Sequence, residues 1–330
     1  MTSANLELLD RKGEPLPLPD LAKRWPLDGW WDVQRVPGGK NDHLRVESAE
    51  GTCFLRRSYR SKTREELRFQ LDHLRTLHRR GLPVPLPVLT TDGDDHVELG
   101  GRLWVLTRAI PGSPYEEQSR AHMRAFGHTV GRYHQLVSDL PAGTGEPALL
   151  GELRQRASDV AADPDVSGRA AHVVGELEAL VPDLPRVVVH GGARRGSLLF
   201  EGSEVVGVLD FDSAHPDVRV LDVAVAVHDV GKVYTQKGAD DHKVALDLSR
   251  VARLLEAYSD ISKLTSAEQA ALPLLLEAKR LKRALGRLQR RQDGEPLSDN
   301  DHAKIAQEHR RLRWLADHRD DLTAACTMAG

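Results

Sequence analysis

The chain has 330 residues, 29% of them charged and 40% hydrophobic, with a formal net charge of −3 at pH 7, which suits a globular protein with two lobes. That balance gives no basic field for nucleic acid or an anionic membrane, and no apolar run approaches the roughly 20 residues that cross a bilayer. With no secretory signal at the start and only two cysteines, Cys53 and Cys326, we expect a cytoplasmic protein without a disulfide framework or a CxxC zinc site.

The N-terminal part has the pattern of a small β-rich lobe. A lead-in segment of about 35 residues carries three tryptophans among prolines, which predicts that it packs on a core. Residues 43–46 and 52–55 then alternate as two strands, and the residues between them suit a hairpin turn. Residues 97–98 and 103–106 predict a second hairpin around two glycines.

One helix is predicted between these hairpins. Its apolar period covers residues 62–80, and Thr63 and Glu66 have the spacing of a capping box at its start. A glycine and a proline-rich stretch end it. Because the next break is Ile110-Pro111-Gly112, we expect an N-terminal lobe of residues 1–110.

The remainder, residues 111–330, is expected to form a larger and mainly helical lobe. Helical periodicity covers residues 121–140, runs from 149 to about 180, and returns after Val220. Residues 187–189 and 205–209 instead have the period of two short strands. The order of these segments predicts an α+β protein.

The last long helix of this pattern is predicted to begin at a second capping box, Thr265 with Glu268. An apolar stripe runs along one face, and a run of basic residues lies opposite. Such a run is usually a solvated face, with an acidic peptide or partner protein as the alternative ligand. The stripe consists of Leu274, Ala278, Leu281, Leu285 and Leu288, and the basic run of Lys279, Arg280, Lys282, Arg283, Arg287, Arg290 and Arg291.

Two stretches in the middle of the chain carry a family pattern. In the first, a run of valines leads into His190-Gly191-Gly192, with Ser197 five residues later. In the second, a strand leads into Asp210-Phe211-Asp212, and Leu221-Asp222-Val223-Ala224 follows. Together they resemble the aminoglycoside phosphotransferase family, which includes choline kinases and one class of homoserine kinases. The resemblance implies a protein-kinase-like bilobal fold, with the loop of residues 187–212 in the helical lobe.

The same resemblance implies a nucleotide site for ATP or GTP. A glycine turn followed by Asn41 matches the family's phosphate-covering turn, and Arg56 matches its strand cation, with Arg57 as the alternative. The helix partner of this cation maps to about Gln70, which carries no charge, so the ion pair is absent unless Glu65 or Glu66 takes that role. The candidate nucleotide-binding residues are Gly38, Gly39, Asn41, Arg56, Arg108, Ala109 and Ile110.

The catalytic loop departs from the family pattern at two positions. Phosphoryl transfer in this family needs a carboxylate that takes the acceptor's proton, and an amide and a second carboxylate that hold magnesium. Gly192 stands at the position of the first carboxylate, where a glycine also suits a tight turn with positive φ. Ser197 stands at the position of the amide, which leaves Asp210 as the firm magnesium ligand. Asp212 is a candidate second ligand or substitute base.

Other residues of the two stretches have expected roles as well. Arg194 and Arg195 add positive charge to the loop and are candidate ligands for phosphate. His190 is expected to be a buried structural histidine, and Asp222 to cap the helix that follows it. With one firm metal ligand, Mg²⁺ dependence is expected to be weak or absent.

The leading hypothesis is a catalytically impaired, pseudokinase-like member of this family that binds a nucleotide, a small-molecule or peptide ligand, or a partner protein. The alternative is an active ATP-dependent phosphotransferase with non-standard catalytic residues, acting on a small hydroxyl compound or on a peptide serine or threonine in a biosynthetic pathway. A third hypothesis makes Arg194 and Arg195 the receptor for an already phosphorylated group.

Overall fold

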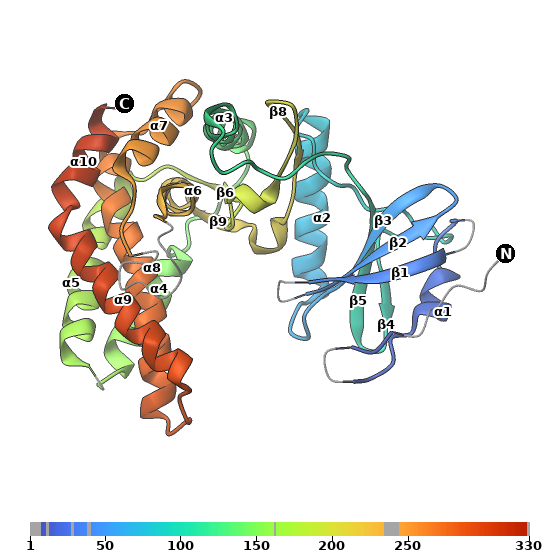
Figure 1. The fold of residues 1–330 in the computed structure, drawn as a ribbon, viewed down its shortest axis with the longest axis horizontal. Helices are drawn as coiled ribbons and strands as arrows, with labels where there is room; N and C mark the ends of the chain where they lie inside the picture. Colours follow the sequence, from blue (N-terminus) through green and yellow to red (C-terminus); the bar gives the residue numbers. More distant parts are fainter. Residues whose placement is uncertain are drawn as a thin grey trace. The chain divides into compact units, whose positions relative to one another are not determined.

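The structure is a computed structural model that describes residues 8–10, 13–27, 30–37, 41–161, 163–233 and 244–328. The chain divides into two compact units, one of residues 1–113 with 206–209, the other of residues 114–205 with 210–330. The first unit contains an antiparallel sheet with two helices, and the second is mainly helical (Figure 1).

The sheet of the first unit has five strands in the order β1-β2-β3-β5-β4. Both predicted hairpins are present, whereas β1 was not predicted because its two tryptophans were assigned to the lead-in segment. Alternate residues of β2 and β3 point into the core, where Leu44, Val46, Cys53 and Leu55 are fully buried. The strands are β1 (Trp30–Val36), β2 (Asp42–Ser48), β3 (Gly51–Arg57), β4 (Val97–Leu99) and β5 (Arg102–Arg108).

The lead-in segment packs on this core, as predicted. It includes α1 (Leu18–Ala22), whose Leu18 and Leu21 are fully buried. Trp25 is also buried, and its indole nitrogen donates a 2.9 Å hydrogen bond to the carbonyl of Val88. These contacts make the segment part of the first unit's core.

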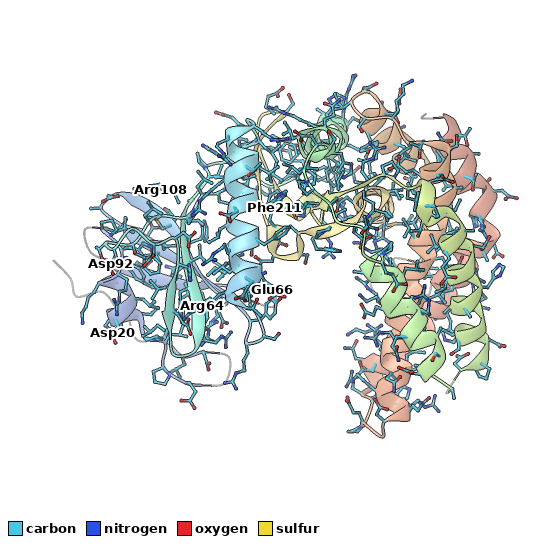
Figure 2. The ribbon with its side chains drawn as sticks, turned by 180° about the vertical axis from the view of Figure 1, so that it is seen from behind. Asp20, Arg64, Glu66, Asp92, Arg108 and Phe211 are labelled. Atoms are coloured by element: carbon cyan, nitrogen blue, oxygen red, sulfur yellow. The ribbon has the colours of Figure 1, made fainter. Side chains whose placement is uncertain are left out.

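The predicted helix is α2 (Arg64–Arg79), and it begins at the predicted capping box. The Thr63 side chain accepts from the Glu66 amide at 3.1 Å, and the Glu66 carboxylate accepts from the Thr63 amide at 2.9 Å. In its first turn Arg64 donates from Nε to Glu98 of β4 at 2.6 Å (Figure 2). Helix and sheet are thereby joined at the helix start.

The second unit is built from eight α-helices among the residues described. The single helix expected from 149 to about 180 is wrong, because the chain becomes extended at Val160. Asp163 then caps a new helix with Pro164 in its first turn, where proline is tolerated. The helices are α3 (Arg120–Val137), α4 (Ala148–Asp159), α5 (Pro164–Leu180), α6 (Val220–Gly231), α7 (Leu248–Ser259), α8 (Ser266–Gln292), α9 (Asp299–Asp317) and α10 (Arg319–Met328).

Helix α8 is the central helix of this unit and contacts α4, α5, α6, α9 and α10 (Figure 1). Its predicted capping box and apolar stripe are both present, and all five stripe residues are buried. The opposite face is not wholly solvated, however: Arg280 is 2% exposed and Lys279 is half-buried. The expectation of a solvated basic face is therefore wrong at Arg280, because α8 has neighbours on several sides.

Four short strands position the family motif. β6 (Arg186–Val189) pairs antiparallel with β9 (His215–Val218), while β7 (Leu198–Glu201) and β8 (Glu204–Val208) form a two-stranded sheet. Tyr133 of α3 donates from its hydroxyl to the carbonyl of Val188 at 2.6 Å, which fixes β6 to the helices. None of the helices in the described ranges is both long and apolar enough to span a bilayer.

Candidate active site

The backbone of the loop after β6 is held by one buried carboxylate. Asp222 of α6 is fully buried and accepts hydrogen bonds from the amides of His190 at 2.6 Å and Gly191 at 2.9 Å. Burial alone would raise the pKa of Asp222, but His134 and His190 together lower it below its ordinary value. The expectation that Asp222 caps a helix is wrong, because its oxygens face the loop and α6 begins without a side-chain cap.

The turn after β8 packs against the same loop. The ring of His190 lies 4.4 Å, centroid to centroid, from the ring of Phe211, and both side chains are buried, which agrees with the predicted structural role of His190 (Figure 2). Gly191 has φ +73, and a Cβ there would lie 2.2 Å from the carbonyl oxygen of Ser213. The loop and the turn therefore meet at two points, one before and one after Asp212.

Gly192, which stands at the position of the family's catalytic aspartate, is not the glycine that this backbone requires. Of these two neighbouring glycines, Gly191 has a positive φ and Gly192 does not. A Cβ on Gly192 would meet its nearest neighbour, Nδ1 of His190, at 3.7 Å, an ordinary contact. The expected tight turn with positive φ lies at Gly191, and position 192 has room for a Cβ.

Asp210 has the most unusual backbone near the loop. Its φ of 65° and ψ of 51° place it in the left-handed region, and it is the one non-glycine residue with positive φ in the described part of the chain. Its side chain is exposed, two residues beyond the end of β8. Asp212 follows in the short 3₁₀ helix η3 (Phe211–Ser213) and is half-buried.

The candidate metal ligands do not fit equally well. Ser197 is 4% exposed, and its hydroxyl donates to the carbonyl of Gly192 at 3.3 Å; its role as a second ligand beside Asp210 stays a prediction. Within the described ranges no three His, Cys, Asp or Glu side chains gather as a metal site. One exposed carboxylate is nevertheless a sufficient protein ligand when nucleotide phosphates supply the others.

The two arginines of the loop have different environments. Arg195 is buried, its Nε donates to Asp229 at 3.0 Å, its Nη1 reaches Glu117, and its guanidinium lies 5.7 Å from the ring of Tyr115. These two carboxylates give Arg195 a structural role, and its predicted binding of phosphate stays a prediction. Arg194 is exposed and keeps the predicted role open.

In the first unit, the strand arginines separate into one structural and one candidate residue. Arg57 is buried, donates from Nε to Asp42 at 2.8 Å and lies over the ring of Trp104. Burial would raise the pKa of Asp42, but Arg57 and a second arginine lower it. Arg56 is half-buried and its guanidinium is 3.5 Å from Oε1 of Gln70, so the structure brings together the predicted strand–helix pair.

The other candidate nucleotide ligands are mixed. Asn41 is 5% exposed, and its side-chain oxygen accepts from the amide of Tyr59 at 2.8 Å. The amide of Ala109 donates to the carbonyl of Thr52 at 3.0 Å, and the exposed Arg108 pairs with Glu50 (Figure 2). Ile110 is half-buried after the end of β5. Gly38 and Gly39 lie outside the described residues.

Sequence reasoning missed three functional features. Asp42 and Asp229 were not recognised as the partners of the two structural arginines, because nothing local marks them. Lys62, directly before the cap of α2, is half-buried 6.0 Å from the ring of Tyr59, and burial lowers its pKa, with the Arg56 charge acting in the same direction. Lys62 is therefore a second cation near Arg56. In the sequence, it could have been found from its place directly before the capping box of α2.

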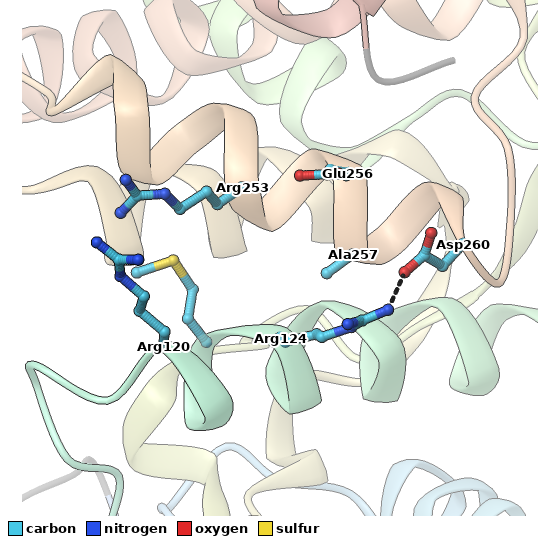
Figure 3. Close-up of a pocket in the computed structure, with 7 residues that line it drawn as sticks. Arg120, Arg124, Arg253, Glu256, Ala257 and Asp260 are labelled. Atoms are coloured by element: carbon cyan, nitrogen blue, oxygen red, sulfur yellow. Dashed lines mark hydrogen bonds and ion pairs between the residues drawn. The ribbon is translucent and has the colours of Figure 1, made fainter.

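A cavity of about 220 Å³ lies elsewhere in the second unit, between α3 and α7 (Figure 3). Arg124 crosses it to pair with Asp260 at 3.1 Å. None of the predicted site residues lines it. The lining residues are Arg120, Met123, Arg124, Arg253, Glu256, Ala257 and Asp260.

Solved structures with the same fold include several small-molecule kinases. An amicoumacin kinase in complex with AMP-PNP, Ca²⁺ and Ami has a TM-score of 0.70 and 17% identity over 92% of each chain. A microcompartment-associated aminopropanol kinase has a TM-score of 0.65 and 17% identity, covering 92% of this chain and 98% of its own. These likenesses confirm the predicted protein-kinase-like fold.

Sequence comparison extends the likeness to named enzymes. A homoserine kinase of Methylobacillus flagellatus is 28% identical over 271 residues, which is 81% of this chain and 82% of that enzyme. The model of a family described as phosphotransferase enzymes matches residues 32–259. This range includes both stretches of the motif and the candidate nucleotide ligands.

Proposed function

We propose, on the premise that this chain belongs to the phosphotransferase enzyme family, that it is an active ATP-dependent phosphotransferase whose acceptor is a small hydroxyl compound. Its relatives include homoserine kinases, and its structural neighbours include an aminopropanol kinase and a kinase bound to an ATP analogue. We further propose that residues 1–110 form the nucleotide-binding lobe and residues 111–330 the lobe with the catalytic loop.

The observation that carries this proposal is the backbone of Asp210. A non-glycine residue in the left-handed region stores about 1–3 kcal/mol of strain, which persists where the surrounding structure enforces it, often at functional sites. Aspartate tolerates this region better than most residues, which reduces the cost without abolishing it. An exposed carboxylate held in this way after β8 supports the proposal that Asp210 is the metal ligand.

The roles of the residues follow from their placement. Asp222 and the His190–Phe211 contact hold the loop in one conformation. Asp210 would hold Mg²⁺, which neutralises charge on the nucleotide phosphates when bound. In the first unit, Arg56 would supply a cation for nucleotide phosphates, with Gln70 as a neutral neighbour.

Asp212 is the proposed substitute for the absent base. Phe211 and Ser213, on either side of it, lie against His190 and Gly191 of the loop, and this packing of the turn on the loop supports the proposal. In the reaction, the acceptor oxygen bonds to the γ-phosphorus, the bond to the ADP oxygen breaks, and the acceptor's proton passes to the Asp212 carboxylate. A poorly placed base slows such a step by up to about 10²–10⁴-fold, so we expect a slow enzyme.

One observation favours a second candidate function. Gly192 has no side chain, and it stands where the family pattern has an aspartate. The loop therefore lacks that carboxylate. If Asp212 does not replace it, the chain is a module that binds a nucleotide, a ligand or a partner protein without transferring phosphate. The two candidates share the fold and differ in the product formed.

The test is phosphoryl transfer from Mg²⁺-ATP to homoserine, choline and further small hydroxyl compounds, followed by ³¹P NMR of the products. We expect a phosphate ester from the wild type, abolished by Asp210→Asn and reduced at least about tenfold by Asp212→Asn. Asp183→Asn, an exposed position in the same unit, should not change the rate. Absence of any ester, together with intact nucleotide binding, would leave the binding module as the function.

A further inference from the structure

Both ring nitrogens of His215 face an oxygen atom that only accepts hydrogen bonds. His215 is the first residue of β9, two positions after the turn η3, and it is half-buried. Its Nδ1 is 2.7 Å from the carbonyl oxygen of Ser213, the last residue of η3. Its Nε2 is 3.1 Å from Oδ2 of Asp217. A carbonyl and an ionised carboxylate have no proton to give, so the imidazole donates both bonds.

The Asp217 carboxylate is fixed as an acceptor. It is fully buried, and it accepts hydrogen bonds from the amide of Ala148 at 3.0 Å and from the amide of Val218 at 2.6 Å. These two amides donate to different oxygens, so each oxygen of Asp217 already receives a backbone proton. Ala148 is the first residue of α4, and the carboxylate thereby joins β9 to that helix. The bond from His215 is the third that Asp217 accepts, which makes His215 an imidazolium.

The carboxylates around the ring favour its charged form. The hydrogen bond to Asp217 raises the pKa of His215 above its ordinary value, and burial opposes that rise. The Ser213 carbonyl and the charge of Asp222, in α6, add to the rise. In the turn itself, the charged residue is Asp212. The hydrogen-bond geometry and the surrounding charge therefore agree on a protonated ring.

The strand and the helix start that adjoin β9 have their charged side chains engaged elsewhere. On β6 the residue opposite His215 is Val189, and Arg186 lies at the other end of the pairing, where its Nε donates to a backbone carbonyl at 3.1 Å. Before α4, Glu146 pairs with Arg154. The ion pair that His215 makes is thus with Asp217 of its own strand.

The carbonyl that His215 holds is also the point where η3 meets the catalytic loop. A Cβ on Gly191 would lie 2.2 Å from the Ser213 carbonyl oxygen, so the backbone of the loop and this carbonyl are closely packed. The amide of Gly191 is in turn bonded to Asp222. A continuous set of contacts therefore runs from Asp217 through His215 and Ser213 to the loop.

We propose that His215 is a positioning residue that, as an imidazolium, holds the turn η3 against the catalytic loop through the Ser213 carbonyl. Asp217 is its anchor on β9 and α4. The catalytic consequence rests on the proposed function, because η3 contains Asp212 and directly follows Asp210. His215 acts through the turn and takes no part in the transfer of the phosphoryl group.

Loss of one proton from His215 should release the turn. The remaining proton stays on Nε2, where the Asp217 carboxylate attracts it, so Nδ1 presents a lone pair to the Ser213 carbonyl at 2.7 Å. Two acceptors at this distance repel each other. Because the folded pKa is raised, the contact is complete below about pH 6.5, the ordinary value of an imidazole, and is lost as the pH rises through the folded value.

The first measurement needs no activity. Two-bond ¹H–¹⁵N correlation spectra of the full chain show which imidazole nitrogens carry a proton, and the signals of His215 are those missing from His215→Phe. We expect both nitrogens to be protonated at about pH 6, with a titration midpoint above about 6.5. A bare nitrogen at about pH 6, or a midpoint at or below about 6.5, would overturn the proposal.

Three substitutions then separate the two bonds of the ring. Asparagine places an amide nitrogen near the position of Nδ1 and glutamine near that of Nε2, whereas phenylalanine keeps a ring without a donor. The readout is deuterium exchange of the Ala214 amide, which donates to the Phe211 carbonyl at 3.0 Å across the turn, relative to the amides of α7. This exchange should become about tenfold faster or more in His215→Gln and His215→Phe, the effect of a lost hydrogen bond to a charged group.

His215→Asn should keep the exchange rate of the Ala214 amide within about threefold of the wild type, as should the control His302→Phe at an exposed position of α9. Equal rates in His215→Asn and His215→Gln, or an unchanged rate in His215→Phe, would overturn the role of the Ser213 bond. Urea denaturation confirms that each variant is folded. A loss of stability common to the asparagine and glutamine variants cancels in their comparison.

Phosphoryl transfer tests the consequence for catalysis. The ratio of the wild-type kcat to that of His215→Asn should fall as the pH rises through the midpoint measured for His215, because asparagine does not titrate. A ratio that is constant across this range would overturn the positioning role. If no chain forms an ester while the titration and exchange results hold, the proposed function fails and the contact of His215 with the turn stands.

Discussion

Two adjacent glycines should respond in opposite ways to the same substitution. Gly191→Ala forces alanine into the left-handed region, at a cost of roughly 1–2 kcal/mol. It also places a Cβ 2.2 Å from the carbonyl oxygen of Ser213, so the turn or the loop must move. That movement disturbs the bond from the Gly191 amide to Asp222, a bond to a charged group worth about 1.5–3 kcal/mol. The sum is a loss of about 2.5–5 kcal/mol.

Gly192→Ala should be close to neutral. Its Cβ meets nothing nearer than 3.7 Å and its φ lies outside the left-handed region. Removing a glycine from the unfolded chain even stabilises by about 0.4–1 kcal/mol when the folded backbone accepts the new residue. Urea denaturation followed by far-ultraviolet circular dichroism measures both variants. If the two variants have equal free energies of unfolding, or if Gly192→Ala is the less stable one, the assignment of the constrained glycine to position 191 is refuted.

Three further substitutions test the charges of the second unit. Asp222→Asn should lower the free energy of unfolding by about 3–5 kcal/mol, because it breaks a buried charged network. The control Asp183→Asn, at an exposed position, should change it by less than about 0.5 kcal/mol. Similar values for the two variants would contradict the role of Asp222. Arg195→Met should cost about 1.5–3 kcal/mol in urea denaturation, because Asp229 loses a hydrogen bond from the guanidinium but keeps Lys232, and a loss as small as that of Arg194→Met would show that Arg195 is not structural. Lys279 has a folded pKa of about 7, below its unfolded value of 10.5, so the folded chain binds fewer protons between these values and stability should rise with pH from about 7 upward. Lys279→Met should reduce that slope in urea midpoints measured across this range, with Arg291→Gln as the control, and an unchanged slope would contradict the burial of Lys279.

Much of the fold could be predicted because its signals are local. The capping boxes at Thr63 and Thr265 are read from residues three apart, and both are present. The glycines of the second hairpin and the apolar stripe of α8 are local in the same sense. The break between α4 and α5 was also marked locally, by Asp163 followed by Pro164, and was missed because the apolar period continues across it.

The site was harder to predict because its contacts join distant residues. The carboxylate of Asp222 and the amide of His190 are 32 positions apart, so spacing alone suggested a helix cap. The same holds for Arg195, whose partner Asp229 is 34 positions away. Nor does the sequence reveal which of two successive glycines takes the positive φ, since either fits the loop. The family pattern located the loop, and only the packing distinguished its residues.

The account's central claim is that the loop has kept its geometry although it lacks a carboxylate at position 192. The direct measurement is the rate of γ-phosphoryl release from Mg²⁺-ATP by the wild type, Gly192→Asp and Gly196→Asp. The last is a control in the same loop, where a Cβ meets nothing within 4 Å. We predict that Gly192→Asp raises the rate by about 10²-fold or more, that Asp210→Asn in the same chain abolishes the gain, and that Gly196→Asp has no effect. A folded Gly192→Asp variant with the wild-type rate would contradict the claim.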